Sequence, residues 1–517
     1  MSTQPYSRVL WVILDGMGFE HFRRALLSGS HPAISRMGHE GFITPMRPAS
    51  PVCQTPPALL ALFSGTQPSQ NRVWGYYMPH PEGIEDSLSG FHADIRQMRT
   101  IWRELEDRGA GYSLMNVAFR YDPVWKGPAE HLVLGFDGYR LWRKPSLYRL
   151  AGRTSWIDYQ GLHLQVRRER STPEGVSLSK GASFRIHVQV GEGRVVAITP
   201  GARAFVHLLE PDLLLLNPVN QAVCRGSAAR GIGSDGFLEM STFHIVRRLN
   251  SFREPLLWVP VEAELLASRV SFQGKANLMV EQARNTTAKL VVGYFPVVDD
   301  FNHAYFDLLL GADDRTERLF HGCVKMVDAL LTRLMEGMEN DALLVVSSDH
   351  GAMAYRSMLH INEALADVGL VRRSAGGYDF RTSLAWYHPS DCGQVVTRSP
   401  SERGRLLGRL TSVLKNLNAD LDAGIGVLDG EAGSPFVAFL YPKGDLYFTG
   451  RPPRRGKPLD KRRSGGHHLS PLSPTPWIQA ALGLWSPRRG RLPESLPFEP
   501  KENVEMKSFL MQAMGLL

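Results

Sequence analysis

Three short apolar runs in the chain are each followed closely by acidic residues. They span residues 8–14, 289–295 and 342–347 and consist mainly of Val, Leu, Ile and aromatic residues. Near-continuous apolar runs of this length are typical of strands that are buried on both faces of a parallel sheet. In open α/β sheets, ligands bind at the carboxyl ends of the strands, which is where these acids fall. The pattern therefore predicts a parallel sheet with a polar site along one edge.

Helical patterns lie between these runs. Residues 57–63 are good helix formers that follow a Pro-Pro pair, and Pro is favoured in the first turn of a helix. Residues 304–310 and 316–338 place apolar and charged side chains at helical spacing. Residues 362–369 predict a short helix that Gly369 closes. The alternation of strands and helices indicates an α/β protein.

Two long segments interrupt the alternation. Residues 100–284 contain many short apolar segments between turn residues, such as SFRIHVQV and RVVAIT, and predict a β-rich insertion. Residues 381–450 combine one helical pattern, at 401–417, with strand patterns at 394–397 and 436–441. They predict a smaller mixed insertion. Near the end of the chain, residues 476–484 fit either a strand or a short helix.

The composition is that of a globular protein. Of 517 residues, 43% are hydrophobic and 21% are charged, which excludes a disordered chain, a collagen and a coiled coil. No apolar run approaches the roughly 18 residues that a membrane helix needs. Asp15 interrupts the short apolar stretch near the N-terminus, so we expect no signal peptide. Four scattered Cys residues without a CxxC pair argue against a disulfide framework, and we expect a cytoplasmic protein without a membrane partner.

The charge balance is basic, with 59 Lys and Arg against 51 Asp and Glu and a net charge of +8. This favours anionic partners, but it does not separate a phosphorylated small molecule from nucleic acid. Basic residues gather in the Pro- and Gly-rich stretch 451–463, where Asp460 is the only acid. The stretch fits a solvated connecting loop, or a loop that attracts an anionic substrate.

Carboxylates and imidazoles follow the predicted strands. Asp15 ends the first run, Asp299 and His303 follow the second, and Asp349 and His350 follow the third. This is a donor set for divalent cations. Asp299 and His303 are four residues apart and can point into one site from a turn or the first coil of a helix. Each motif alone fits an ordinary turn or cap, but together they indicate a shared site.

A second pair of imidazoles lies late in the chain. His467 and His468 follow a Gly-Gly pair, which suits a loop that approaches a site closely. No Cys belongs to the whole set, so a zinc ion bound here would be catalytic rather than structural.

In this order the motifs resemble those of the alkaline phosphatase superfamily, and within it the type I phosphodiesterase/nucleotide pyrophosphatase branch. The resemblance covers about residues 1–95, 285–385 and 460–490. In the family, the nucleophile precedes the Gly of a Thr/Ser-Gly dipeptide by ten residues, and a Pro follows it by two. Ser64-Gly65 therefore implies that Thr55 is the nucleophile and Pro57 the following Pro.

The resemblance also implies two metal sites. One would take Asp299, His303 and His467, and the other would take Asp15, Thr55, Asp349 and His350. The neighbours Asp300 and His468 are the alternatives to Asp299 and His467 if the alignment is off by one residue. We expect two divalent ions, with Zn²⁺ first and Mn²⁺ as the alternative, since both accept carboxylate and imidazole.

The chain departs from the family at two positions and also differs from a related branch. The family's Asp-His-Gly-Met motif matches residues 349–351, with Met353 one residue late. Nucleotide pyrophosphatases use an Asn about twenty residues after the nucleophile to donate to a phosphate oxygen, and Tyr76 stands there in this chain. A phenol can also donate one hydrogen bond, although a packing role is equally compatible. Sulfatases need Cys or Ser followed by Pro and Arg, whereas Cys53 lies two residues too early and Leu59 stands at the Arg position. The sequence therefore argues against a sulfatase.

The function that the resemblance implies is a two-metal-dependent hydrolase of phosphate esters, a phosphodiesterase or a phosphatase. Thr55 would attack phosphorus and form a phospho-threonine, which water then hydrolyses. Arg462 and Arg463 in the basic stretch would attract the anionic substrate. A phosphomutase or phosphotransferase on the same core is the alternative, and a nucleic-acid-binding protein with a vestigial metal site is a further one.

The expected fold is an alkaline-phosphatase-like core with a mostly parallel central sheet flanked by helices, plus a β-rich insertion and a smaller α/β cap insertion. We divide the chain into residues 1–95 (first part of the core), 96–285 (β-rich insertion), 286–385 (second part of the core), 386–460 (cap insertion) and 461–517 (last part of the core, with the final His ligand).

Overall fold

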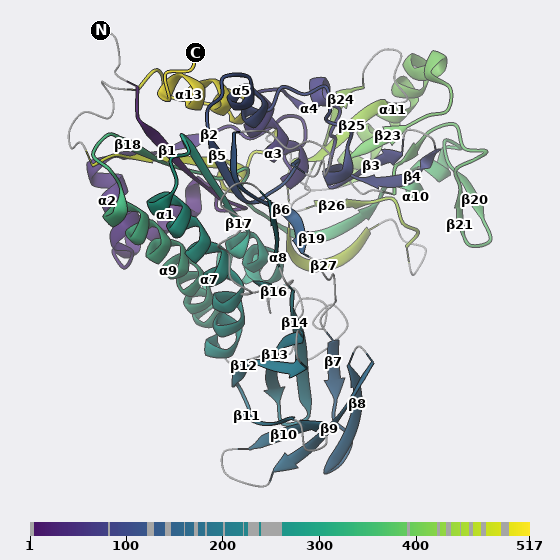
Figure 1. Ribbon diagram of the computed structural model, residues 1–517. Coiled ribbons are helices and arrows are strands. Elements are labelled where there is room, and N and C mark those ends of the chain that lie inside the picture. Colours follow the sequence, from purple (N-terminus) through teal and green to yellow (C-terminus); the bar gives the residue numbers. More distant parts are fainter. Residues whose placement is uncertain are drawn as a thin grey trace.

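The computed structural model gives the fold of most of the chain (Figure 1). It describes residues 5–517 except 81–82, 121–128, 140–145, 160, 170–173, 181–183, 200–201, 221, 226–236, 239–260, 390–392, 421–423, 431–435, 445, 454–458, 467–471 and 488–495. No helix among the described residues is both long and apolar enough to cross a membrane.

The described strands of the core form one eight-stranded sheet. In spatial order they are β15 (Ala222–Arg225), β6 (Glu130–Tyr139), β5 (Tyr112–Val117), β17 (Leu290–Phe295), β1 (Arg8–Leu14), β18 (Ala342–Ser347), β28 (Ala480–Trp485) and β2 (Phe42–Met46). The five strands from β6 to β18 run parallel, and β15, β28 and β2 pair antiparallel with their neighbours. The expected α/β class with a mostly parallel sheet is confirmed.

The three apolar runs lie side by side at the centre of this sheet, as predicted. β1 pairs with β17 on one side and with β18 on the other. Alternate residues of β1 enter two different cores: Leu10, Val12 and Leu14 face one, and Val9, Trp11 and Ile13 face the other. A strand buried on both faces therefore explains why the run is continuously apolar.

Helices cover both faces of the sheet (Figure 1). The first core contains side chains of α1 (Phe19–Ser28), α2 (Pro32–Glu40), α7 (Val261–Asn285), α8 (Val297–Leu310) and α9 (Asp314–Gly337). The second contains side chains of α3 (Thr55–Ser64), α5 (Ile101–Asp107) and α13 (Met506–Ala513). The helices predicted from residues 57–63, 304–310 and 316–338 correspond to α3, α8 and α9.

The β-rich insertion projects away from the sheet (Figure 1). One of its sheets contains β8 (Thr154–Tyr159), β9 (Leu162–Glu169), β10 (Gly175–Lys180) and β11 (Phe184–Gln189). The other contains β7 (Ser146–Arg149), β12 (Gly193–Thr199), β13 (Ala202–Glu210), β14 (Leu213–Asn220) and β16 (Phe237–Leu238). Side chains from both sheets share one apolar core.

The segment 96–285 also contains structure that its strand-like pattern did not predict. β5 and β6 join the central sheet, and α7 packs against β17 and α9. The helical pattern of α7 is weak in the sequence, because its apolar residues do not gather in one stripe and Gly274 interrupts it. Its helical state depends on packing against the core.

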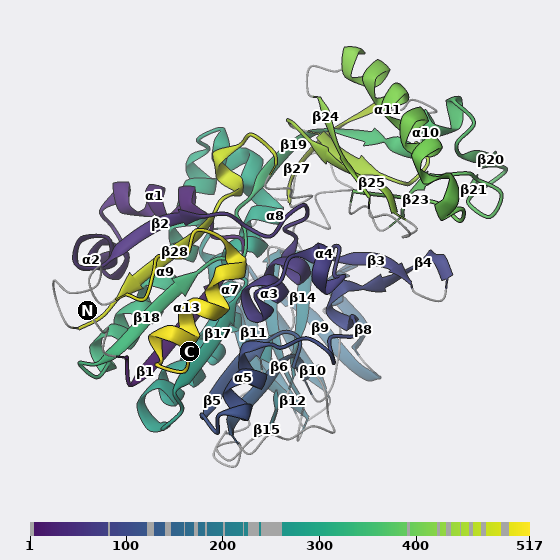
Figure 2. The ribbon, with the colours of Figure 1, turned by 90° about the horizontal axis from the view of Figure 1, so that it is seen from above.

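The cap insertion forms a small body beside the core (Figure 2). It contains α11 (Arg403–Asp420), β22 (Trp386–Tyr387), β23 (Gln394–Val396), β24 (Ile425–Asp429) and β25 (Phe436–Pro442), which share an apolar core. The helix α10 (Ile361–Asp367) contributes to the same core, although it lies before residue 386, where we placed the start of the cap. A three-stranded sheet of β26 (Leu446–Thr449), β19 (Met353–His360) and β27 (Leu459–Gly466) adjoins it.

Two expectations for the last third of the chain change with the structure. We expected the basic stretch, residues 451–463, to be a loop, but its last five residues begin β27, which pairs antiparallel with β19. Residues 476–484 fitted either a strand or a short helix, and they contain both: a 3₁₀ turn, η4 (Pro476–Ile478), followed by β28.

Candidate active site

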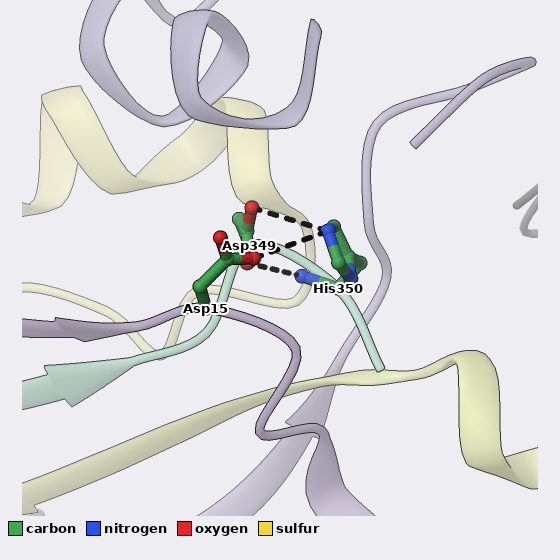
Figure 3. Close-up of side chains that lie close together, drawn as sticks. All are labelled: Asp15, Asp349 and His350. Atoms are coloured by element: carbon green, nitrogen blue, oxygen red, sulfur yellow. Dashed lines mark hydrogen bonds and ion pairs between the residues drawn. The ribbon is translucent and has the colours of Figure 1, made fainter. Parts of the chain in front are cut away.

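Three acidic or imidazole side chains meet at the carboxyl edge of the central sheet. Asp15 directly follows β1, and Asp349 lies two residues beyond the end of β18, with His350 next to it. Because β1 and β18 are parallel neighbours, their carboxyl ends bring these residues together. All three are buried, with Asp349 and His350 fully inaccessible. Figure 3 shows both carboxylates beside the imidazole ring.

The Nε2 atom of His350 is the centre of this cluster. It lies 3.3 Å from Oδ1 of Asp15 and 3.4 Å from Oδ2 of Asp349. The Oγ1 atom of Thr55 lies 3.3 Å from the same nitrogen. Four side chains from three distant parts of the sequence therefore converge on one point, and they are the four that the resemblance assigns to one metal site.

The hydrogen bonds of the cluster indicate what belongs at that point. His350 Nδ1 lies 2.8 Å from the carbonyl oxygen of Gly351, which can only accept, so Nδ1 carries a proton. When a cation is bound, the ring would be neutral and its Nε2 lone pair would face the carboxylates. Oδ1 of Asp15 and Oδ2 of Asp349 are buried and receive no hydrogen bond from the described residues. Two carboxylate oxygens and an imidazole lone pair facing one another fit a divalent cation.

Electrostatics lead to the same conclusion. Burial, followed by the negative charges of Asp349 and Asp299, raises the pKa of Asp15 well above its usual value. The Tyr294 hydroxyl donates a hydrogen bond to Asp15 and opposes that shift. Burial also raises the pKa of Asp349, against the influence of His350. Buried carboxylates that repel one another are stabilised by a nearby cation.

A second pair of expected ligands lies on α8. Asp299 and His303 are one helical turn apart, and His303 Nε2 lies 3.2 Å from Asp299 Oδ2. The first turn of α8 packs closely against the turn that follows Asp15. Gly16 in that turn has φ +63°, and a Cβ atom there would lie 2.7 Å from Asp299 Oδ1. The two groups of ligands therefore adjoin across Gly16, where only glycine fits.

Asn302 and His21 link α8 to the turn after Asp15. The Asn302 side-chain amide donates to the carbonyl oxygen of Gly16 at 2.9 Å. That bond leaves Asn302 Oδ1 to accept from His21 Nε2 at 3.0 Å. Burial lowers the pKa of His21 to about 4, so the ring is neutral near pH 7. The link stabilises the position of α8 relative to the sheet edge.

Thr55 is the first residue of α3, and Tyr76 belongs to a neighbouring loop. The backbone N–H of Tyr76 donates to Oε1 of Gln54, the residue before Thr55, at 2.5 Å. The ring of Tyr76 is partly exposed and contacts the rings of Tyr77 and Phe91 edge-on. The structure thus ties the Tyr76 loop to the turn that contains Thr55.

The remaining expected residues lie on or just beyond β27. Gly466, its last residue, pairs with Met353, and β27 contacts α8. His467 and His468 lie outside the described residues. The backbone of Arg462 and Arg463 belongs to β27, at an irregularity in its pairing with β19, and their side chains lie outside the description.

Sequence analysis did not identify several residues that support the cluster, namely His21, Gln54, Tyr294, Asn302 and Asn503. Tyr294 left a faint signal, because a phenol near the end of a buried apolar strand needs a hydrogen-bond partner. The other four left none, since Asn, Gln and His residues are common in loops and helices and their partners are distant in the sequence.

Comparison with known sequences identifies one family. The sequence model of type I phosphodiesterase/nucleotide pyrophosphatase matches residues 9–142 and 244–436, more than half of the chain. The unmatched stretch between them contains most of the β-rich insertion. A search of curated proteins found no match.

Solved structures share the fold at low sequence identity. Murine ectonucleotide pyrophosphatase/phosphodiesterase 5 is 12% identical, with a TM-score of 0.50 over 99% of this chain and 95% of its own. It has also been solved as an inactive variant in complex with AMP, with the same identity, coverage and TM-score. Phosphonoacetate hydrolase from Sinorhizobium meliloti 1021, in complex with phosphonoformate, is 14% identical, with a TM-score of 0.51 over 99% of this chain and 96% of its own.

The family match, the sheet topology and the order of the motifs agree with one another. The matched segments contain the three central parallel strands, the start of α3 and both described groups of expected ligands. The chain belongs to the type I phosphodiesterase/nucleotide pyrophosphatase family, within the alkaline phosphatase superfamily.

Proposed function

We propose that this protein hydrolyses phosphate esters through a phospho-threonine at Thr55, with two divalent cations in the site. The observation that carries the proposal is the 3.3 Å approach of Thr55 Oγ1 to His350 Nε2, within a cluster that has the donors of a cation site. One ion would be held by Asp15, Thr55, Asp349 and His350, and the other by Asp299, His303 and His467. Membership of the family supports the class of reaction.

The position of Thr55 suits an attack on phosphorus. At the first residue of α3 it lies at the positive end of the helix dipole, which favours a phosphate. Its Oγ would form a bond to phosphorus while the bond to the leaving alcohol breaks, with one proton lost from Thr55 and one gained by the alcohol. Water would then attack phosphorus, break the Oγ–P bond and return a proton to Thr55. Bound divalent cations would favour the deprotonated hydroxyl and stabilise the phosphoryl oxygens.

Two other candidate nucleophiles have less suitable surroundings. Ser64 is nine residues further along α3, about 14 Å along the helix axis, and its hydroxyl donates to the Leu60 carbonyl at 2.6 Å. Cys53 is fully buried among apolar side chains, and burial raises the pKa of its thiol well above the usual value. A protonated, buried thiol is a poor nucleophile.

The proposed substrate is an anionic phosphorylated molecule. Two proteins of the same fold were solved with AMP and with phosphonoformate, which both carry phosphorus oxyanions. In this chain Tyr76 would donate a hydrogen bond to a phosphate oxygen. Arg462 and Arg463 would raise the local concentration of the anion from β27, which contacts α8.

The metal identity and the compartment are parts of the same proposal. Zn²⁺ suits the carboxylate and imidazole donors, with Mn²⁺ as the alternative. We place the protein in the cytoplasm, where Cys53 and Cys323, both buried and free in the structure, would stay reduced. Metal analysis of protein purified without added metal would distinguish the two ions.

The test is a comparison of Thr55→Ala and Thr55→Ser with wild type on phosphate monoesters, diesters and phosphonates. Thr55→Ala should lose turnover yet keep metal, because Asp15, Asp349 and His350 remain. Thr55→Ser, which retains a hydroxyl, should keep part of the activity. Thr411→Ala, a change on the exposed face of α11, is the matched control and should behave as wild type.

Acid quenching during turnover should trap phosphate on Thr55 in the wild type. Full activity of Thr55→Ala would refute the assignment. Phosphate release only in the presence of an acceptor alcohol would indicate the phosphotransferase alternative. Binding of nucleic acid that weakens steeply with salt, without ester cleavage, would favour the binding-protein alternative.

A further inference from the structure

Asn503 reaches the expected metal ligands from a part of the chain far away in sequence. It opens a 3₁₀ turn, η5 (Asn503–Glu505), which contacts α3. The side chain is fully buried, and its Nδ2 donates to the backbone carbonyl oxygen of Asp349 at 2.7 Å. The residue lies outside the segments that match the family model, which end at residue 436.

The bond acts on the peptide group that joins two expected ligands. The carbonyl of Asp349 and the N–H of His350 belong to one planar unit. Asn503 holds the carbonyl edge of that plane, and Oδ1 of Asp349 accepts from the N–H edge at 3.0 Å. Rotation of the plane about the axis through the two Cα atoms would break both bonds, and the Asp349 carboxylate would lose the N–H group that holds its Oδ1.

The orientation of this peptide plane decides which oxygen of the Asp349 carboxylate faces the proposed position of the cation. Oδ1 of Asp349 accepts from the N–H groups of His350 and Gly16, at 3.0 and 3.3 Å. Oδ2 is thereby left to face Nε2 of His350 at 3.4 Å. The hydrogen bond from Asn503 therefore supports the side-chain arrangement that a cation would meet.

Asn503 is itself held in place by the end of β2. Its backbone N–H donates to the Arg47 carbonyl at 2.9 Å, and the Arg47 N–H donates to the Lys501 carbonyl at 2.7 Å. Arg47 also forms an ion pair with Glu502 at 2.7 Å. With its backbone fixed, the buried amide cannot follow the Asp349 loop if that loop moves.

We infer that Asn503 is a positioning residue that sets the metal affinity of the Asp15–Asp349–His350 cluster by fixing the Asp349–His350 peptide. The inference rests on the proposed function, since it needs that cluster to bind a cation. Groups that orient metal ligands without touching the metal typically contribute about 10–100-fold to affinity or activity. We expect Asn503→Leu, which keeps the size and removes the donor, to weaken metal binding by at least about 10-fold.

The experiment titrates the metal-free full-length protein with Mn²⁺ or Zn²⁺ by calorimetry or chelator competition. A His303→Ala background isolates the cluster from the second group of ligands. The matched control is Asn362→Leu, because Asn362 is equally buried and also donates to backbone carbonyls, those of Tyr387 and Gly450 in the cap. Both changes should lower the thermal midpoint of the metal-free protein, but only Asn503→Leu should weaken metal binding.

Two results would overturn the inference. One is unchanged affinity in Asn503→Leu, and the other is an equal loss in Asn362→Leu, which would indicate general destabilisation. Should Asn503→Leu fail to fold, Asn503→Asp carries the test, because a carboxylate of the same size cannot donate to the carbonyl when ionised. The variant Asp349→Asn distinguishes an error in the positioning role from an error in the proposed metal site. If it also leaves affinity unchanged, the proposed metal site is wrong and the positioning role falls with it.

Discussion

The two groups of expected ligands are built in different ways. The strand-end group, Asp15, Thr55, Asp349 and His350, is assembled from segments far apart in the sequence and is almost completely buried. The helix group contains Asp299 and His303, one turn apart on α8, with His467 as its expected third member. The His303 side chain is 16% exposed, whereas that of His350 is fully buried.

This difference teaches how each group depends on the rest of the fold. An i, i+4 pair forms whenever its helix forms, so its geometry is local. The strand-end group forms only when β1, β18 and α3 are all in their native positions, and it relies on further hydrogen bonds from Tyr294 and Asn503. Perturbations of the core should therefore disturb the strand-end group before the helix group.

The largest expected effect is that of His350→Ala. His350 Nε2 contacts all three other members of the strand-end group, so its loss should remove one metal ion and the activation of Thr55 together. We expect turnover to fall by about 10³-fold or more. Elemental analysis and steady-state kinetics would check this, with circular dichroism as the control for folding. If His350→Ala keeps two metal ions and its turnover, the strand-end group does not depend on His350.

His303→Ala tests the helix group and should cost less. It should remove the other metal ion, leave the strand-end ion bound and reduce turnover by about 10²-fold. His467→Ala should resemble it if His467 completes the group. A damaging His468→Ala beside a harmless His467→Ala would show that the alignment of the Gly-Gly-His-His segment is off by one residue. Metal stoichiometry of the four proteins, wild type included, distinguishes these outcomes.

The link between the groups should be sensitive to acid. His21 is neutral in the folded protein, with its pKa lowered from 6.5 to about 4, so its contribution to stability is complete above pH 6.5. It is lost as the pH falls towards 4, because the unfolded chain binds the proton more tightly. The free energy of unfolding should drop by about 2 kcal/mol from this group between pH 7 and pH 5.

The variant His21→Gln isolates that contribution. It keeps a side-chain donor for Asn302 but does not titrate, so its unfolding free energy should change less between pH 7 and pH 5 than that of the wild type. Denaturant unfolding at the two pH values measures the difference. Equal pH dependence in both proteins would mean that His21 is not buried as a neutral ring.

The smallest expected effect is that of neutralising Arg462 and Arg463 on β27. Surface charges act mainly on the encounter with an anionic substrate and are screened over about 8–10 Å at physiological salt. The double change to Gln should raise KM by about 2–5-fold at low salt and much less at physiological salt, with little change in kcat. If the kinetics depend neither on salt nor on the double change, the basic stretch 451–463 only connects neighbouring elements and does not attract the substrate.

Sequence patterns were enough to predict the elements that are buried among apolar side chains on both faces. Apart from Arg8 and Ser347 at their ends, β1 and β18 are apolar because both faces of the sheet are covered, and the predicted ranges agree with the structure. α7 escaped prediction because its helical state comes from packing against β17 and α9 rather than from one apolar stripe. β27 escaped because its Arg- and Gly-rich sequence is typical of a loop, and only its pairing with β19 makes it a strand.

The same distinction holds within the site. Asp15, Asp349 and His350 follow buried strands, so a rule about strand ends was enough to group them. The supporting hydrogen bonds could not be predicted, because Tyr294, Asn302 and Asn503 meet their partners through tertiary structure alone. The assignment of Thr55 as nucleophile came from the family resemblance rather than from any pattern of charge or hydropathy.

The bond from Asn503 to Asp349 also has a consequence for the order in which the protein matures. The two residues are 154 positions apart. A ribosome that adds about 5–20 residues per second makes Asn503 roughly 8–30 s after Asp349. During that interval the emerging loop lacks the amide that fixes its peptide plane. If Asn503 sets metal affinity, tight capture of the ion at this loop must wait until the later segment has been synthesised and has docked beside β2.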